Sequence, residues 1–135
     1  MEVRGCFDAE DWGYVIEASL RNPLQDLRFP ENGKILMKVD TGFSGPVLVT
    51  NEVFEFLRLS DIEVPDEIRP TYRTLAGTFT MRSAPAILEV NGKQLETDTL
   101  APLLGPSKLL VGCKILRELN LALLGNKTYF VRPQP

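Results

Sequence analysis

The residues best suited to chemistry in this chain are Asp40, Thr41 and Gly42, which stand between two apolar runs. The first run, Ile35–Val39, leads into them, and the second, Pro46–Val49, follows shortly after. Short runs of β-branched and aliphatic residues bounded by turn residues are typical of buried strands. Asp40 is therefore expected where a buried strand ends and a tight turn begins, a place where a carboxylate is costly unless it is paired or used.

Two interpretations of this turn follow from its residue types. In the plain one, Asp40 bonds nearby backbone amides, as aspartates in turns commonly do. In the other, the carboxylate takes part in catalysis. Gly42 allows another chain segment to approach closely, and the hydroxyls of Thr41 and Ser44 can each donate and accept a hydrogen bond.

The chain contains no histidine, which restricts the chemistry it can perform. Neither one chain nor a homodimer can assemble a Ser-His-Asp or Cys-His arrangement. Two cysteines are too few for the usual structural zinc sites. General acid–base chemistry then falls to carboxylates, with lysine, tyrosine or cysteine as weaker agents. A hydrolase built on Ser44 and Lys38 is a further alternative, although nothing in the sequence brings those two groups together.

Length and charge limit the remaining function classes. The 135 residues fit one domain spanning 1–135. A net charge of −3 gives no basic surface for nucleic acid, and no apolar run is long enough to span a bilayer. The first residues are acidic and lack an apolar signal core, so we expect a cytoplasmic protein.

Many short strands with two short helices indicate a closed or sandwiched β fold. The first helix is expected to begin at Thr50, whose side chain can cap it, and to end near Ser60. Hairpins are expected at Ala76-Gly77 and at Asn91-Gly92. The strands are expected over residues 2–7, 13–20, 34–39, 72–75, 78–83, 86–90, 94–100, 108–111, 121–124 and 128–131, and the second helix over 113–119.

Asp-Thr-Gly between two apolar strands resembles the active-site loop of the aspartic proteases. With one such loop at this length, the chain resembles the retropepsin-like group, whose members work as homodimers. Leu110-Val111-Gly112 and the helix after it match the apolar-apolar-Gly stretch that crosses near the catalytic loop in that family. The resemblance implies an all-β fold, a closed six-stranded acid protease barrel with one or two short helices.

The same resemblance implies an aspartic endopeptidase that needs no metal and no organic cofactor. Asp40 from each of two copies would share a proton, so that one carboxylate activates water while the other acts as the acid. Thr41 would hydrogen-bond across the dimer, Gly42 would expose backbone to the carboxylates, and Ser44 would donate to the outer oxygen of Asp40.

The hairpin at Ala76, Gly77 and Thr78 would be the flap that closes over an extended polypeptide substrate. For Gly77 alone, the interpretation as a plain hairpin glycine is favoured over a flap role, since glycine is the default turn residue. The chain also departs from the family, because Phe43 stands where a small alanine is usual and its ring can crowd the pocket. The other function class is therefore a non-catalytic retropepsin-like module for dimerisation or peptide binding.

Overall fold

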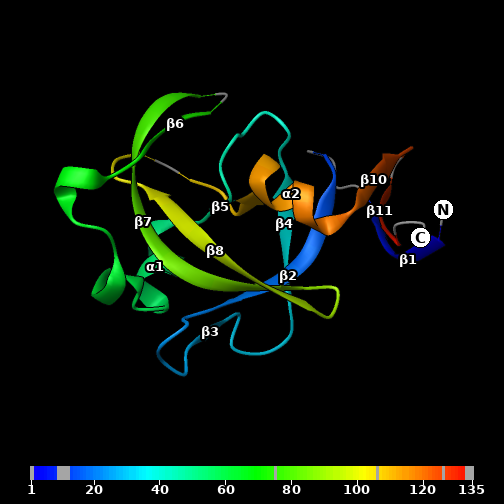
Figure 1. Ribbon diagram of the computed structural model, residues 1–135, viewed down its shortest axis with the longest axis horizontal. Helices are drawn as coiled ribbons and strands as arrows, with labels where there is room; N and C mark the ends of the chain where they lie inside the picture. The colour runs from blue at the N-terminus through cyan, green and yellow to red at the C-terminus, as the bar shows by residue number, and fades with distance from the viewer. Residues whose placement is uncertain (1, 9–12, 75, 106, 126, 133–135) are drawn as a thin grey trace.

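The computed structural model describes residues 2–8, 13–74, 76–105, 107–125 and 127–132. These residues form a large mixed sheet, a small three-stranded sheet and a few short helices (Figure 1). The strands are β1 (Glu2–Asp8), β2 (Val15–Arg21), β3 (Arg28–Phe29), β4 (Ile35–Val39), β5 (Val47–Leu48), β6 (Thr71–Thr74), β7 (Gly77–Val90), β8 (Lys93–Pro102), β9 (Leu110–Val111), β10 (Leu121–Leu124) and β11 (Lys127–Arg132). The helices are α1 (Asn51–Phe56) and α2 (Cys113–Leu119), with 3-10 turns η1 (Leu59–Ile62) and η2 (Asp66–Ile68).

The large sheet closes on itself. Its order is β3-β2-β4-β9-β5-β8-β7-β6, and β2 pairs with β7 as well. The strands β2, β4, β9, β5, β8 and β7 therefore form a ring, with β3 and β6 outside it. The β4–β9 and β5–β8 pairs are parallel, whereas β5 and β9 run antiparallel. The closed six-stranded barrel expected from the sequence is confirmed, and so is the prediction of two short helices.

The small sheet gathers the beginning and the end of the described chain. Its order is β1-β11-β10, and both pairs are antiparallel. It lies at one end of the molecule, to the right of the large sheet in Figure 1. No helix of the described residues combines the length and apolarity that a membrane span requires.

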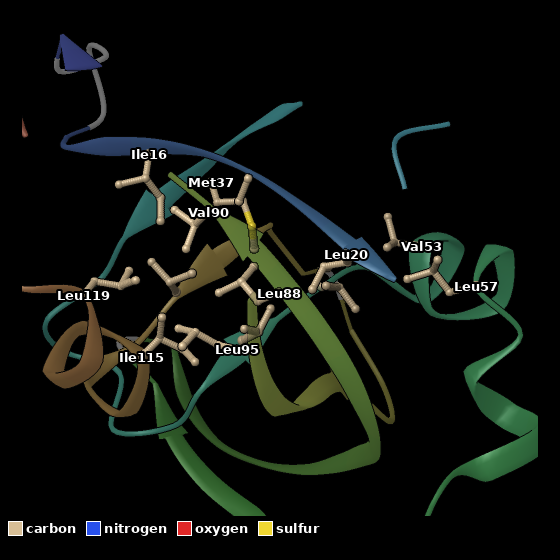
Figure 2. Packing of buried hydrophobic residues seen from close by; sticks show 14 of the residues in the cluster. Ile16, Leu20, Met37, Val53, Leu57, Leu88, Val90, Leu95, Ile115 and Leu119 are labelled. Atoms are coloured by element: carbon tan, nitrogen blue, oxygen red, sulfur yellow. The ribbon is translucent and has the colours of Figure 1, made fainter. Parts of the chain in front are cut away.

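The main hydrophobic core joins strands of the ring to α1, α2 and β11. Figure 2 shows side chains from β2, β4, β7 and β8 meeting those of α1 and α2. Along β4, Met37 and Val39 are buried while Leu36 is exposed and Lys38 is half-buried, the alternation expected of a strand with one face on a core. A second, smaller cluster lies apart from this core and contains Phe43, Leu48, Met81, Leu100 and Leu110.

Helix α1 begins as predicted but ends earlier. Thr50 Oγ1 accepts a hydrogen bond from the Val53 amide at 3.2 Å, which confirms the cap. The predicted end near Ser60 is wrong: α1 stops at Phe56, and Arg58 adopts a left-handed conformation with φ of 54°. Leu57 and Leu59 are both fully buried, and residues two apart in one helix cannot share a face. The turn at Arg58 brings both into the core.

The two strands predicted over 78–83 and 86–90 are one continuous strand, β7. Pro85 does not interrupt it, because β6 pairs with residues 77–80 and β2 with residues 87–89. Pro85 pairs with Asp98 of β8 on one edge of β7, and among the described residues no strand pairs with it on the other edge, where a missing N–H is tolerated. The hairpin at Asn91-Gly92 is confirmed, with φ of 49° and 75°. Leu75, which the prediction placed in the strand before β7, lies outside the described residues.

Candidate active site

The backbone ladder between β4 and the segment around β9 fixes the position of Asp40. The Lys38 amide donates to the carbonyl of Leu109 at 3.1 Å, and the Asp40 amide donates to the carbonyl of Val111 at 3.0 Å. Asp40 is therefore still bonded to the neighbouring strand at the point where β4 ends. Its side chain is half-buried, between the buried core strand and an exposed loop.

The loop after Asp40 is held by that residue itself. The Gly42 amide donates to Asp40 Oδ1 at 2.9 Å, and the Phe43 amide donates to the Asp40 carbonyl at 3.3 Å. The turn aspartate of the plain interpretation is thus present. Within the described residues Oδ2 of Asp40 accepts no hydrogen bond, so one carboxylate oxygen is held and the other stays available for chemistry. Thr41, Gly42 and Ser44 are all exposed.

Phe43 does not crowd the pocket beside Asp40. Its side chain is 1% exposed and belongs to the smaller hydrophobic cluster, and it does not line the pocket. The ring stacks at a tilt against Tyr72, with centroids 5.6 Å apart. The expectation that this ring can crowd the pocket is corrected, because the ring turns inward between two glycines.

Those two glycines, Gly45 and Gly112, provide the space that Phe43 occupies. A Cβ on Gly45 would lie 2.6 Å from Cζ of the Phe43 ring. A Cβ on Gly112 would lie 2.7 Å from Phe43 Cδ2 and would also overlap the carbonyl oxygen of Gly45. Such distances are far inside van der Waals contact. We call the loop over residues 40–46, between β4 and β5, the acid loop. Gly112 is required where the end of β9 passes this loop, which gives the Leu110-Val111-Gly112 stretch a steric reason.

The start of α2 ties this crossing to the acid loop. The amides of Gly112 and Cys113 donate to the carbonyls of Pro46 and Phe43, at 2.7 and 2.9 Å. Cys113 Sγ lies 3.2 Å from the carbonyl oxygen of Thr41 and donates to it. The loop that carries Asp40 is held from β9 and α2 as well as by its own turn.

A pocket of about 370 Å³ opens beside Asp40. This volume lies in the range usual for ligand sites. Three of its apolar residues, Leu48, Met81 and Leu110, come from the smaller hydrophobic cluster, which therefore forms its apolar wall. The full lining is Lys38, Asp40, Leu48, Thr74, Ala76, Phe79, Met81, Pro102, Ser107, Lys108 and Leu110.

The hairpin between β6 and β7 supplies one side of this pocket. Thr74 Oγ1 accepts from the Ala76 amide and donates to the Gly77 carbonyl, each at 3.1 Å. Gly77 has φ of 129°, a conformation that favours glycine. Ala76 lines the pocket together with Thr74 and Phe79, whereas Gly77 and Thr78 are exposed and do not.

The structure thus brings together part of the predicted site. Asp40 and Ala76 share the pocket, and Thr41 and Gly42 lie in the exposed loop beside it. Ser44 is exposed, and within the described residues no hydrogen bond joins its hydroxyl to Asp40. The described residues also contain no cluster of three or more carboxylates and thiols arranged to hold a metal ion.

Sequence reasoning missed most of the pocket, including Lys108, and it considered Lys38 only as a partner of Ser44 in a different hydrolase. Both lysines lie within two residues of positions that the sequence did single out, Asp40 and Leu110. The strand alternation carried the signal, since residues i and i+2 of a strand share a face.

No family model matches the chain. A relative from Archaeoglobus fulgidus is 29% identical over 113 residues, which cover 81% of this chain and 84% of the relative, and it is described as an uncharacterized protein.

Two solved structures are similar to this one. A retropepsin-like aspartic protease from Rickettsia conorii superposes with a TM-score of 0.56 at 20% identity, covering 93% of this chain and 86% of that one. EIAV protease in complex with the inhibitor HBY-793 superposes with a TM-score of 0.51 at 15% identity, covering 82% and 90%. At these identities the likeness is one of fold. The chain has the retropepsin-like fold that the Asp-Thr-Gly loop and its surroundings indicated.

Proposed function

We propose that this protein is an aspartic endopeptidase whose active unit is a homodimer. One observation supports this above all: Asp40 borders a pocket of ligand size, with one carboxylate oxygen held by its own turn and the other open. In a retropepsin-like fold this is where a catalytic carboxylate is expected. The turn bond by itself fits a structural aspartate equally well, so the adjoining pocket is what favours catalysis.

The chemistry requires a second carboxylate. Peptide hydrolysis needs a base to activate water and an acid to protonate the carbonyl oxygen and then the leaving amine. One Asp40 cannot fill both roles at once, and a two-fold axis beside it would supply the other from a second copy. Thr41, Gly42 and Ser44 are exposed around Asp40, so the loop leaves room for that approach. Thr41 is then the residue proposed to bond across the axis.

The substrate would be an extended polypeptide lying between the acid loop and the β6–β7 hairpin. Such chains bind through backbone hydrogen bonds, with pockets for alternate side chains. Ala76, Thr74 and Phe79 line the hairpin side of the pocket, and Gly77 and Thr78 complete the hairpin tip. Closure of this hairpin would exclude water from the bond to be cleaved.

The test is digestion of a peptide library by wild type and by Asp40→Asn. Asparagine keeps an oxygen for the Gly42 amide but cannot take up or give a proton. We expect cleavage to fall by at least about a hundredfold, while the mass in solution is unchanged. Asp98→Asn is the matched control, because Asp98 is an exposed carboxylate on β8 away from the pocket. Cleavage by Asp40→Asn at the wild-type rate would contradict the proposal and leave the binding-module alternative.

A further inference from the structure

The pocket beside Asp40 has a charge pattern that its apolar wall does not require. Its charged lining residues are Lys38, Asp40 and Lys108, two cations and one carboxylate. Lys38 already has an interaction partner within the protein, so the exposed Lys108 is the cation of this lining that can meet a bound ligand. Most of the remaining lining is apolar. A pocket of this kind suits a side chain with an apolar stem and a negatively charged end.

The strand register explains why both lysines lie on the side of Asp40. Lys38 precedes Asp40 by two residues along β4, so the two side chains share a face. The opposite face of β4 carries buried Met37 and Val39. Lys108 precedes Leu110 by two residues, and Leu110 is the register partner of Lys38 in β9. These pocket residues thus lie on the β4–β9 pair or within two residues of it.

We infer that this pocket selects a glutamate or aspartate side chain of the peptide beside the bond to be cleaved, with Lys108 as the selecting residue. The inference rests on the proposed function, whose substrate class it names. Lys38 has an interaction partner of its own within the protein, whereas the exposed Lys108 stands at the mouth of the pocket. In a two-fold dimer each copy offers the same pocket, so acidic residues are favoured on both sides of the bond.

Binding can be measured separately from cleavage. Two fluorescent peptide libraries, identical except for glutamate or glutamine at one central position, are titrated against Asp40→Asn, and wild type digests the same libraries. Glutamine has the shape of glutamate without its charge. We expect up to about fivefold tighter binding of the glutamate library, the upper end of what one exposed ion pair contributes. The preference shrinks as salt rises from about 0.05 M to about 0.5 M, because salt screens exposed charges.

Three variants, each also carrying Asp40→Asn for the binding measurement, test the assignment to Lys108. Lys108→Met removes the preference while keeping the apolar stem, and Lys108→Glu reverses it toward a matched lysine library. Lys34→Glu makes the same charge change at an exposed lysine outside the pocket and leaves the preference intact. A glutamate preference that survives Lys108→Met, or one that Lys34→Glu abolishes equally, overturns the inference.

The outcomes separate this inference from the proposed function. Cleavage and binding of both libraries without a glutamate preference overturn the inference and leave the peptidase. A glutamate preference in binding, without cleavage by wild type, supports the inference and overturns the peptidase. Binding of neither library overturns the inference directly.

Discussion

At the scale of single residues, the acid loop depends on where one aromatic ring goes. Phe43 is buried because Gly45 and Gly112 leave room for it, and its ring then forms part of the cluster that walls the pocket. A side chain on either glycine would meet that ring. The ring position, more than the turn itself, links the acid loop to the pocket.

Gly45→Ala is predicted to lower the free energy of unfolding by about 1–3 kcal/mol, the usual cost of overpacking a core. Its Cβ would lie 2.6 Å from Phe43 Cζ and 3.0 Å from Tyr72 Cε1, both side-chain atoms. Phe43→Leu shortens the side chain, so in that background Gly45→Ala costs less, a coupling that a double-mutant cycle detects. Urea unfolding at fixed protein concentration measures it.

Gly112→Ala is the matched comparison for this cycle. Its Cβ would overlap backbone as well as side chain, namely the carbonyl oxygens of Gly45 and Phe43. Phe43→Leu therefore leaves its cost largely in place. Equal rescue of both glycine variants would contradict the steric account of the loop.

The sequence sufficed to locate Asp40, because a turn triplet between two apolar runs is a local pattern. It did not show that Phe43 turns inward. That position depends on Gly112, which is distant in sequence and reaches the acid loop only because the chain folds back beside it. It also gave no sign that Lys38 and Lys108 line one pocket with Asp40. Their shared pocket follows from the parallel β4–β9 register, which no local pattern reveals.

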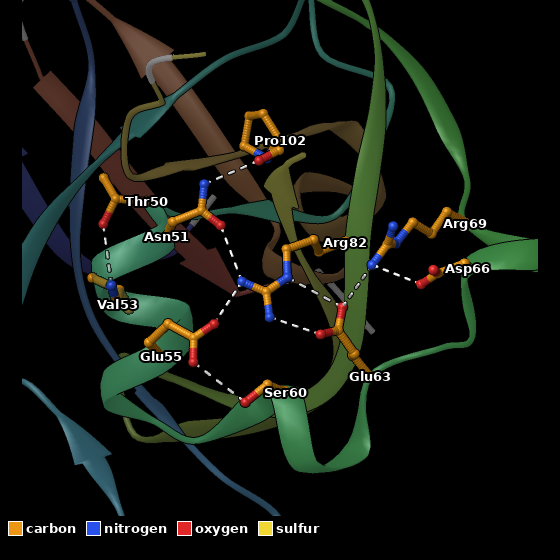
Figure 3. Close-up of polar contacts among 10 residues, drawn as sticks. All are labelled: Thr50, Asn51, Val53, Glu55, Ser60, Glu63, Asp66, Arg69, Arg82 and Pro102. Atoms are coloured by element: carbon orange, nitrogen blue, oxygen red, sulfur yellow. Dashed lines mark hydrogen bonds and ion pairs between the residues drawn. The ribbon is translucent and has the colours of Figure 1, made fainter. Parts of the chain in front are cut away.

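At the scale of elements, Arg82 joins the short helices to the barrel (Figure 3). Its guanidinium lies on β7 and binds Glu63 through two hydrogen bonds of 3.2 and 2.7 Å, and Glu55 of α1 at 2.7 Å. It also stacks over the Phe54 ring, 4.3 Å from the centroid. The hydrogen bond to Glu63 raises the pKa of Arg82 and outweighs the burial that lowers it, so the group stays charged at any working pH.

Arg82→Lys is predicted to reduce the free energy of unfolding by about 1–2 kcal/mol. Lysine keeps the charge but cannot form the two-pronged contact with Glu63 or reach several partners at once. The control is Arg58→Lys, an exposed arginine paired with Asp61 at 3.6 Å, for which a change below about 0.5 kcal/mol is expected. Chemical unfolding of both variants checks this. Equal effects would show that Arg82 is only another surface arginine.

Element boundaries divide into those the sequence could and could not predict. The Asn91-Gly92 hairpin and the Thr50 cap have local chemical signatures, and both are confirmed. The early end of α1 has no such signature, because the left-handed turn at Arg58 serves the burial of Leu57 and Leu59 together. The unbroken β7 likewise depends on which strands lie beside Pro85. Tertiary packing decided both.

At the scale of the whole molecule, one copy contributes a pocket whose lining includes a single carboxylate, that of Asp40. The proposed reaction needs two carboxylates. The ring closure that no single element reveals is what sets Asp40, the hairpin and β9 around one space. If the second Asp40 comes from another copy, catalysis is a property of the assembly, and its loss in one copy disables the other as well.

Mixing wild type with Asp40→Asn tests this directly. Co-refolded at equal amounts, the two chains would give about half of all dimers with one asparagine, so the activity per wild-type chain falls to about half of that of wild type alone. Light scattering should meanwhile report twice the 15.1 kDa of one chain for wild type, variant and mixture. A mixture that keeps the full activity of its wild-type share would mean that each chain works by itself, since an inactive neighbour then takes nothing away. The shared site also predicts that a monomer is inactive, because a single Asp40 cannot be base and acid in the same step. A monomeric species that still cleaves peptides would therefore exclude the shared site.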